Sequence, residues 1–367
     1  MTADVRVAFD HRIFVYQKHG GISRYFCGLT EELGGFGVTP KVIAPAFVTD
    51  RLAALPSDLR WGRHIRPRPR VQRAAQIAGE VLHASLARRF RADIVHETYF
   101  NARRAAPRGV PVVLTIYDMI HELFPQYFPG DNTTTAKRAA IARADRIVCI
   151  SESARDDLLR FYPEAADRTS VIMLAGDQSF GDGVTAAEAV RACPFILYVG
   201  ARGRYKNFIA LAHAFARSRL PGEFVELVCV GGGRFDGEER GELERLGVAD
   251  SVTQVDADDV LLARLYREAA MFVCPSLYEG FGIPALEAMM AGCPVVAMRA
   301  SSLPEVCGDA AEYAEPGSID SLVAAIETVA LSPGRADAMR AAGLERARLF
   351  SWKRCAEETA AVYRSLV

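Results

Sequence analysis

The chain has 367 residues, of which 50% are hydrophobic and 24% are charged, and its formal net charge is −1. This is the composition of a soluble globular protein, and the length suits two domains. The opening residues do not resemble a signal peptide and no apolar run is long enough to cross a bilayer, so we expect a cytoplasmic protein.

Short apolar runs alternate with helical patterns along the whole sequence, which predicts βαβ units and parallel sheets. In the first half we expect strands at 5–9, 41–44, 93–96, 112–116, 146–150 and 171–174, and helices at 23–33, 71–90 and 152–161. In the second half we expect strands at 195–199, 225–230, 252–255, 271–274 and 294–297, and helices at 239–246, 319–330 and 351–366 and after residues 208, 260 and 283.

These elements predict an α/β fold with two doubly wound, Rossmann-like domains that face each other across a cleft. A segment rich in glycine and aspartate, 176–183, separates the two series of elements. We place the first domain at residues 1–182 and the second at 183–350. The last helix, within 351–367, is expected to cross back to the first domain.

Loops that follow the expected strands of the first half are candidates for ligand contact. Gly20 and Gly21 lead into a helix, so their amides are expected to bind an anion, although the sequence is not the Gly-x-Gly-x-x-Gly of a dinucleotide site. Asp118 and His121 follow one strand and His96 ends another. Both histidines suit contact with a ligand hydroxyl group, and a purely structural role is the alternative for each.

Residues 51–110 are strongly basic, with thirteen arginines against four acidic residues. Such a surface suits anionic lipid headgroups, in a peripheral membrane contact, or an acceptor that carries a diphosphate. A merely solvated surface is the alternative. We do not expect nucleic acid as a partner, because the motif and the interleaved aromatic residues of such binders are missing.

The loop after the first strand of the second domain combines glycine with cationic side chains: Gly200, Arg202, Arg204, Lys206 and Asn207. Cations placed in advance stabilise negative charge that develops on a leaving group. A second glycine loop, with Gly231 and Gly232, ends the next strand and suits a nucleotide or a simple tight turn.

The segment from Glu279 to Glu287 carries the most specific signal in the sequence. It follows the apolar run 271–274, which has the length of a buried parallel strand, and Pro284 and Gly292 mark the ends of a helix. The loop at the start of this helix, where free amides favour an anion, consists of Gly280, Phe281, Gly282 and Ile283.

Two carboxylates flank this expected anion site. A carboxylate does not bind phosphate directly, so the groups that suit Glu279 and Glu287 are hydroxyls, one set on a sugar and one on a ribose. A nucleotide sugar carries all of these groups. The alternative is that Glu287 complements the helix dipole and Glu279 is a solvated loop residue.

Taken together, these residues resemble the family 4 retaining glycosyltransferases of the GT-B fold over nearly the whole chain. The motifs that match in order and approximate spacing are Gly20-Gly21, Lys206-Asn207, the run 275–282, the run 300–306 and the two glutamates separated by seven residues. The resemblance implies a first domain for the acceptor and a second for the donor. It also implies an enzyme without a metal or other cofactor, whose nucleotide sugar is a co-substrate.

The same resemblance assigns roles to individual residues. It implies that Lys206 and an arginine bind the diphosphate, with Arg202 favoured over Arg204. Glu279 and the amides after it would then contact the donor sugar, and Glu287 the ribose. The chain departs from the family at Tyr117-Asp118, where a His-Asp pair is common, so the role of that histidine passes to His121 or is absent.

Two short runs, Tyr127-Phe-Pro129 and Ser151-Glu-Ser153, look like those of bacterial surface-polysaccharide enzymes, including O-antigen and other lipopolysaccharide enzymes. Many of these transfer mannose from GDP-mannose to a glycan or a polyprenyl-diphosphate-linked glycan. A UDP-hexose donor, a nucleotide-sugar 2-epimerase and a noncatalytic sugar-binding protein are the alternatives. The eight cysteines occur singly without a Cys-x-x-Cys pair, so we expect reduced core thiols and no metal site.

Overall fold

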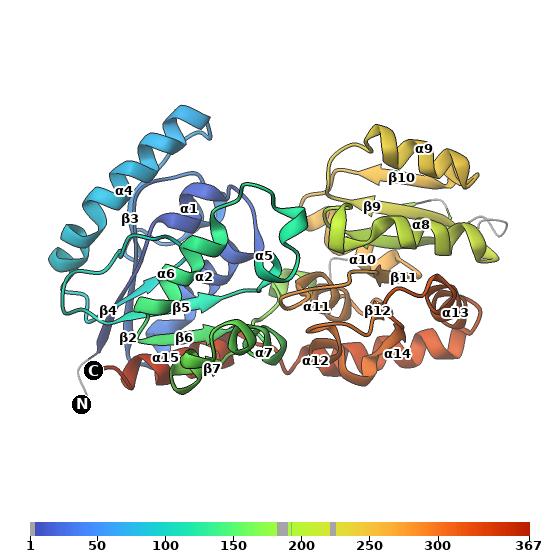
Figure 1. The fold of residues 1–367 in the computed structure, drawn as a ribbon. Coiled ribbons are helices and arrows are strands. Elements are labelled where there is room, and N and C mark those ends of the chain that lie inside the picture. The colour runs from blue at the N-terminus through green and yellow to red at the C-terminus, as the bar shows by residue number, and fades with distance from the viewer. Residues whose placement is uncertain (1–3, 182–189, 192, 221–224) are drawn as a thin grey trace. The chain divides into compact units, whose positions relative to one another are not determined.

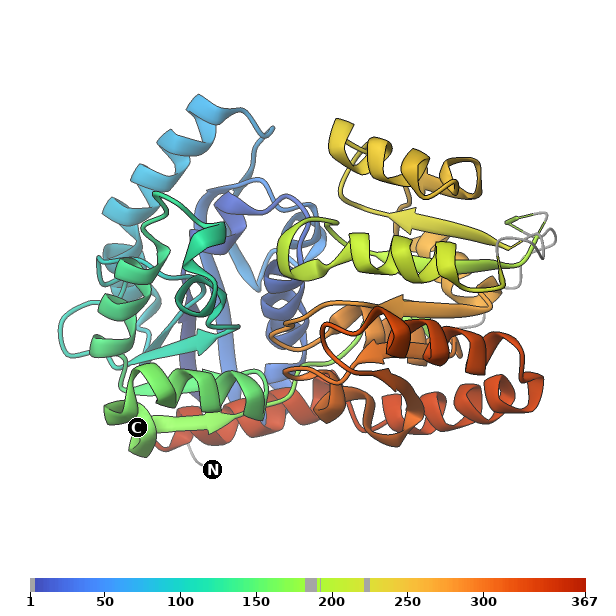
Figure 2. The ribbon, with the colours of Figure 1, turned by 45° about the vertical axis from the view of Figure 1, so that its right-hand side comes forward.

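The computed structural model describes residues 4–181, 190–191, 193–220 and 225–367. The chain forms two compact units, Met1–Ala175 with Ser351–Val367, and Gly176–Phe350. Each unit is built on one parallel sheet with helices on both of its faces (Figures 1 and 2). The prediction of two doubly wound α/β domains is confirmed. The expected boundary at 182/183 lies outside the described residues.

The sheet of the first unit has seven parallel strands in the order β3-β2-β1-β4-β5-β6-β7. The strands are β1 (Val5–Phe9), β2 (Val38–Phe47), β3 (Arg60–His64), β4 (Ile94–Glu97), β5 (Val112–Ile116), β6 (Arg146–Cys149) and β7 (Thr169–Val171). Strands β4 and β5 are buried along their whole length, as expected where helices cover both faces of a parallel sheet.

The helices of this unit are α1 (Arg12–Tyr16), α2 (Gly21–Glu32), α3 (Asp50–Ala54), α4 (Pro69–Phe90), α5 (Ile120–Leu123), α6 (Thr133–Arg143), α7 (Glu152–Phe161) and α15 (Trp352–Arg364). Local sequence explains several of their ends. Ser151 and Ser351 accept hydrogen bonds from backbone amides in the first turns of α7 and α15. Pro69 begins α4, and Arg91 ends it in the left-handed conformation.

Helix α15 belongs to the first unit although it lies at the end of the chain. It packs against α2, where a Cβ atom on Gly28 would lie 2.7 Å from the Trp352 ring. The side chain of Tyr363 is fully buried. The last helix thus supplies part of the core of this unit.

The sheet of the second unit has six parallel strands in the order β10-β9-β8-β11-β12-β13. The strands are β8 (Phe195–Val199), β9 (Glu226–Val230), β10 (Val252–Val255), β11 (Met271–Cys274), β12 (Val295–Met298) and β13 (Ala311–Ala314). The helices are α8 (Phe208–Arg217), α9 (Gly237–Arg245), α10 (Asp259–Glu268), α11 (Ile283–Met290), α12 (Leu303–Cys307), α13 (Ile319–Ala330) and α14 (Pro333–Ala347).

Each sheet contains one place where the order of strands reverses. In the first unit this place lies between β1 and β4, and in the second between β8 and β11. Adjacent loops leave such a pair of strands in opposite directions, and ligands of open α/β sheets bind in the crevice this creates at the carboxyl ends. The loops after β8 and β11 contain the cationic and glutamate motifs of the sequence.

Candidate functional site

The structure brings Lys206 and Glu279 together at the strand reversal of the second unit. Lys206 lies in the loop between β8 and α8, and Glu279 in the loop between β11 and α11. The Lys206 Nζ atom donates to both carboxylate oxygens, at 2.7 and 2.8 Å. The side chains are 23% and 11% exposed, respectively. The pair is therefore well formed and still partly accessible to solvent.

Backbone contacts tie these two loops to each other. The Leu277 amide donates to the Tyr205 carbonyl at 2.8 Å. The Asn207 side-chain amide donates to the Pro275 carbonyl at 3.1 Å. Asn207 has a φ of 59°, in the left-handed region where asparagine is among the favoured residues. The Asn207 side chain thus links the two loops and does not point to solvent.

A third loop holds the backbone of Glu279 from the other side. The Glu279 amide donates to the Ser301 Oγ atom at 2.8 Å, and the Ser302 Oγ atom donates to the Glu279 carbonyl at 2.8 Å. Both serines lie between β12 and α12. The sequence showed them only as part of a matching run, without a role for either. Their hydrogen bonds fix the position from which the carboxylate projects.

The charge of Lys206 is stabilised by its partner. Burial by itself would lower the Lys206 pKa, but the adjacent Glu279 carboxylate outweighs burial and raises the pKa above its ordinary value. Lys206 therefore remains an ammonium ion throughout the neutral pH range. It is available as a fixed positive charge.

Helix α11 begins directly after this pair. Gly282 has a φ of 99°, which favours glycine, and Ile283 is the first helical residue. Phe281 is buried, and its ring packs edge-on against Phe350 at 5.8 Å between centroids. The Phe281 side chain thus anchors the loop, and only its backbone is suited to ligand contact. Gly280 lies at the start of this turn, between Glu279 and Phe281.

Glu287 lies on α11, one turn after the helix start, and is 4% exposed. It is separated from the loop of Glu279 by the first turn of the helix, as its spacing in the sequence requires. The helix has Pro284 in its first turn and Gly292 with a φ of 70° after its last, so both predicted ends are confirmed.

Arg202 is occupied by protein groups. Its guanidinium forms an ion pair with Glu239, with Nε to Oε1 at 2.9 Å, and donates to the carbonyls of Gly231 at 2.8 Å and Arg234 at 3.0 Å. The residue is 5% exposed. The family resemblance favours Arg202 as a diphosphate ligand, whereas in the structure these contacts occupy its guanidinium and make it a brace for the glycine loop after β9.

The glycine loop depends on this brace. Gly231, Gly232 and Gly233 have φ values of 88°, 72° and 72°, a left-handed run that other residues rarely adopt. A Cβ atom on Gly232 would lie 2.8 Å from an Arg202 nitrogen, and one on Gly231 would lie 3.2 Å from the Gly200 carbonyl oxygen. The loop is therefore packed directly on the loop after β8.

Arg204 differs from Arg202 in its surroundings. It lies two residues before Lys206, in the 3-10 turn Arg204–Lys206, and it is exposed. Its φ of 61° is unusual for a residue other than glycine. Backbone strain of this kind often occurs at functional sites.

In the first unit, Gly20 and Gly21 lie where the sequence placed them, at the start of α2. Gly20 precedes the helix, Gly21 is its first residue, and the Ser23 amide of the first turn donates to the Gln17 Oε1 atom at 3.3 Å. A side-chain oxygen thus occupies one backbone amide in the first turn of this helix. Asp118 and His121 lie in the same unit, after β5.

Asp118 and His121 both have structural partners. The Asp118 Oδ1 atom accepts from the Ile120 amide at 3.2 Å, and its carbonyl accepts from the Lys137 Nζ atom at 3.0 Å. The His121 Nε2 atom is 3.4 Å from the Asp131 Oδ2 atom. Its ring lies 4.2 Å from that of Phe128, between centroids. Lys137, fully buried on α6, was not among the candidates from the sequence.

His96 is a core residue, which contradicts its expected contact with a ligand. It is fully buried, with Nδ1 at 2.7 Å from the Tyr363 hydroxyl and Nε2 at 2.8 Å from the Thr115 hydroxyl. Burial lowers the pKa of His96 to about 3, so the imidazole is neutral. Its role is to hold helix α15 on the sheet.

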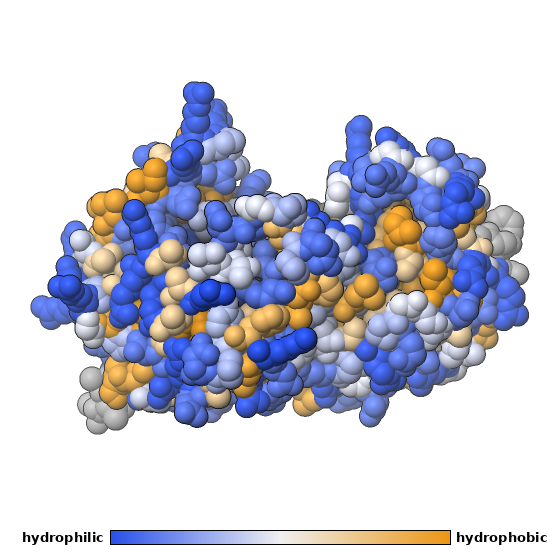
Figure 3. All heavy atoms as spheres, in the orientation of Figure 1, coloured by the Kyte–Doolittle hydropathy of each residue, from blue (hydrophilic) through white to orange (hydrophobic). Residues whose placement is uncertain are grey.

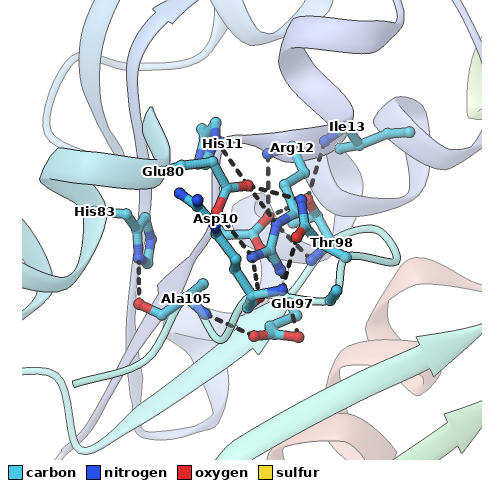
Figure 4. Close-up of polar contacts among 12 residues, drawn as sticks. Asp10, His11, Arg12, Ile13, Glu80, His83, Glu97, Thr98 and Ala105 are labelled. Carbon is cyan, nitrogen blue, oxygen red and sulfur yellow. Dashed lines mark hydrogen bonds and ion pairs between the residues drawn. The ribbon is translucent and has the colours of Figure 1, made fainter. Parts of the chain in front are cut away.

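A buried charge network fills the strand reversal of the first unit, and Figure 4 shows its side chains converging. Asp10, after β1, pairs with Arg12 at 3.0 Å and accepts a hydrogen bond from the Thr98 amide at 3.1 Å. Arg12 also reaches Glu97 at 3.4 Å and Glu80 at 3.0 Å. Asp10, Arg12 and Glu97 are fully buried. The sequence argument did not identify this network.

Beside this network, the first unit has a pocket of about 460 Å³. Aromatic and polar side chains share its lining, which includes Tyr16, Gln17, Tyr99, Phe100, Asn101 and Asp131. The Tyr16 and Tyr99 rings meet edge-on, 5.8 Å apart. Arg143 donates to the Asn101 carbonyl at 2.7 Å and so connects the pocket wall to Glu97 of the network.

Comparison with known families matches both halves of the chain. Residues 19–174 match the model described as Glycosyltransferase Family 4, and residues 189–346 match that of Glycosyl transferases group 1. O-antigen chain mannosyltransferase B of Escherichia coli is 30% identical over 275 residues, which cover 69% of this chain and 70% of that protein. The chain therefore belongs to the family 4 glycosyltransferases and is an enzyme of the transferase class.

Other similar proteins agree with this family. MMP alpha-(1->4)-mannosyltransferase of Mycolicibacterium hassiacum is 32% identical over 226 residues, which cover 60% of this chain and 54% of that protein. The chain thus spans over two thirds of the first relative and about half of the second. The structure of Anabaena HepE in complex with UDP and glucose shares the GT-B fold, with a TM-score of 0.72, 18% identity and coverage of 98% and 99% of the two chains.

Proposed function

We propose that the protein is a retaining glycosyltransferase of bacterial surface polysaccharide synthesis, such as that of lipopolysaccharide O-antigen. It transfers a hexose, mannose from GDP-mannose, to a glycan or polyprenyl-diphosphate-linked glycan. The observation that carries the proposal is the Lys206–Glu279 pair at the strand reversal of the second unit, next to the start of α11. A cation, free helix amides and a carboxylate are what a nucleotide sugar requires.

In this proposal the ammonium group of Lys206 neutralises the donor diphosphate, together with the exposed Arg204. Glu279 then accepts hydrogen bonds from sugar hydroxyls and Glu287 from the ribose. Arg202 acts indirectly, by fixing the glycine loop of Gly231 and Gly232. These protein groups supply the positive charge, so we propose that the reaction needs no metal or other cofactor.

The proposed transfer breaks the bond between the anomeric carbon and the diphosphate oxygen. A new bond forms between that carbon and the acceptor oxygen on the same face of the sugar, and the acceptor proton passes to the departing phosphate. Lys206 stabilises the negative charge that builds up on the diphosphate. Retention of anomeric configuration is inferred from family resemblance, and nuclear magnetic resonance of the product linkage tests it directly.

The choice of mannose is supported by mannosyltransferases among the similar proteins. The choice of GDP as its carrier rests on the family resemblance of the sequence. A UDP-hexose is the second candidate, because HepE of the same fold was solved with UDP and glucose. For the acceptor we propose the pocket lined by Tyr16, Tyr99 and Asn101. Aromatic faces together with amide groups suit the alternating apolar and hydroxyl surfaces of a sugar ring.

The decisive experiment is a thermal-shift series with GDP, UDP and their hexose conjugates. A ligand that binds only the folded state at a hundred times its Kd adds about 2.7 kcal/mol of stability, which raises the Tm by several degrees. We expect GDP and GDP-mannose to stabilise the protein more than UDP and UDP-glucose. The opposite ranking would favour a UDP-hexose as the donor in place of GDP-mannose. No shift of the Tm with any of these four compounds would refute the donor site.

A nucleotide-sugar 2-epimerase is separated from a transferase by isotope exchange. An epimerase exchanges the hydrogen at C2 of the nucleotide sugar with solvent, whereas a transferase leaves that hydrogen in place. We expect no exchange in deuterated water.

We further propose that the enzyme is cytoplasmic and works at the inner face of the plasma membrane, which its arginine-rich segment 51–110 contacts. All eight cysteines are free thiols, as is usual in a reducing compartment. A polyprenyl-linked acceptor is held in the bilayer, so an enzyme that uses it gains from contact with the membrane surface.

A further inference from the structure

Helix α4 exposes an apolar stripe. Val71, Ile77, Val81 and Leu82 are 40, 57, 66 and 45% exposed, respectively. Twelve large hydrophobic side chains are exposed among the described residues, so this one helix carries four of them. In Figure 3, hydrophobic side chains gather along the flank of α4.

The stripe is separate from the face that holds α4 in the fold. The inner face consists of Ala75, Gly79, His83, Ala87 and Phe90, which recur every three or four residues and are buried. This face packs against β1 and β2. The exposed side chains are therefore not needed to fix the helix, and a change in them leaves its packing intact.

Positive charge frames the stripe at both ends. Arg70 and Arg73 lie in the first turns of α4, Arg88 and Arg89 in its last turn, and all four are exposed. Arg70 and Arg88 are 18 positions apart, which corresponds to about 27 Å along a helix. The surface thus has an apolar centre between two cationic ends.

Acidic residues are nearly missing from this part of the sequence. Residues 60–91 contain nine arginines and one acidic residue, Glu80. The Glu80 carboxylate accepts hydrogen bonds from Arg12 at 3.0 Å and Asn101 at 3.0 Å, both on the protein side of the helix. It therefore does not offset the outward positive charge.

We propose that the exposed face of α4 docks on an anionic lipid bilayer, with the helix axis parallel to the membrane surface. Val71, Ile77, Val81 and Leu82 would enter the boundary between headgroups and acyl chains, while the arginines at both ends bind lipid phosphates. None of the helices in the described ranges has the length and apolar character of a membrane span. The inference names the surface for the membrane contact of the proposed function and rests on that function for its purpose.

A second copy of the chain is a poorer occupant than lipid. Symmetric pairing through this face would bring the cationic ends of two α4 helices together, and like charges at close range oppose association. An anionic bilayer instead offers opposite charge at both ends of the helix and an apolar layer between them.

The test is co-sedimentation of the full chain with vesicles. We expect binding to phosphatidylcholine vesicles that contain phosphatidylglycerol, weak binding to phosphatidylcholine alone, and a decrease as salt rises. Val81→Glu should lower the partition coefficient at least about ten-fold. Replacement of Arg70 or Arg73 by Gln should lower it roughly five-fold each, because each arginine contributes to attraction by anionic lipid.

Val260→Glu is the matched control, because Val260 on α10 is 61% exposed, close to the 66% of Val81. This variant should bind vesicles like the unchanged protein. Equal binding of Val81→Glu and the unchanged protein, or binding that ignores phosphatidylglycerol, would overturn the proposal. So would a dimer in vesicle-free solution that Val81→Glu dissociates, because a second copy would then cover the stripe.

The outcome is independent of the donor site. Release of nucleoside diphosphate from the nucleotide sugar, measured without lipid, should be the same for Val81→Glu and the unchanged protein. Lost vesicle binding with retained release supports docking through α4. Vesicle binding without any release would leave the docking surface intact and contradict the proposed function instead.

Discussion

The two sheets reverse their strand order in equivalent places but fill these places differently. Between β1 and β4, the first unit has Asp10, Arg12 and Glu97, all fully buried and paired with one another. Between β8 and β11, the second unit has Lys206 and Glu279, also paired but 23% and 11% exposed. The charge network of the first unit is closed to solvent, with the pocket of Tyr16 and Tyr99 beside it, whereas the charge pair of the second unit remains accessible.

The buried charges of the first unit contribute to stability, whereas the charge pair of the second unit is available for chemistry. A charge pair buried in the first unit cannot exchange partners without exposing an uncompensated ion, whereas Lys206 can leave Glu279 for a phosphate at the same site. The charged side chains at this topological position therefore act as a structural lock in the first unit and as candidate ligand groups in the second. Substitutions at the first place should lower stability, and substitutions at the second should lower activity.

The largest expected effect is on stability, from Asp10→Ala. Loss of Asp10 leaves Arg12 buried with incomplete compensation, which should cost about 3–5 kcal/mol of unfolding free energy. Urea denaturation of the two proteins measures this cost. If the variant were as stable as the unchanged protein, the first strand reversal would not be a structural lock.

Lys206→Ala should act on activity instead. Loss of the cation that stabilises the leaving diphosphate should lower kcat/KM about 100- to 1000-fold. The loss of unfolding free energy should be smaller than for Asp10→Ala, because the Lys206–Glu279 pair keeps some contact with solvent. Glu279→Ala should also lower transfer strongly without unfolding the protein. Lys353→Ala, an exposed lysine on α15, is the control for removal of a lysine. If Lys206→Ala unfolded the protein, Lys206 would be needed for stability as Asp10 is, and the two units would not differ in this respect.

The third prediction concerns pH and His96 in the first unit. Its pKa is about 3 in the fold against 6.5 for an ordinary histidine, so the unfolded chain takes up a proton that the fold does not. The free energy of unfolding is therefore at its full value above pH 6.5 as far as His96 is concerned. It decreases as pH falls, by about 2 kcal/mol between pH 6.5 and 5, because protons bind to this histidine in the unfolded chain. Denaturation at several pH values should show a shallower slope for His96→Asn.

The smallest effect is expected in the glycine loop of the second unit. Gly232→Ala puts a Cβ atom at a φ of 72° and 2.8 Å from Arg202, which should cost roughly 1–2 kcal/mol and weaken nucleotide binding. Gly241→Ala in α9 has open space around its Cβ atom and should be neutral or slightly stabilising. Calorimetric titration with GDP compares the two variants. Equal affinities would show that the loop does not contribute to the site.

The sequence predicted the central strands well and the edge strands unevenly, since the edge strand β10 begins and ends at the expected residues. Strands β8 and β11 begin and end at the expected residues, because a strand buried on both faces is a short apolar run. Strands β3 and β13 at the sheet edges were missed. An edge strand such as Arg60–His64 lies partly in solvent and shows no apolar pattern. Helices α6 and α14 were also missed.

The candidate site could be predicted in part. Lys206 and Glu279 were found from their motifs, and their meeting follows from the adjacency of β8 and β11. The partners of Arg202 could not be foreseen, because Glu239 lies on another helix and its spacing carries no signal. The lock of Asp10 and Arg12 was missed for the same reason, since its other members, Glu80 on α4 and Glu97 on β4, are far from both in the sequence.

Helix α15 bears on how the protein is made. The bond between His96 and Tyr363 joins residues 267 positions apart, so the first unit lacks part of its core until the ribosome has made helix α15. The second unit, by contrast, is contiguous and is able to fold while the remainder emerges. Loss of the last seventeen residues, 351–367, should therefore harm the first unit, at the opposite end of the sequence from the truncation.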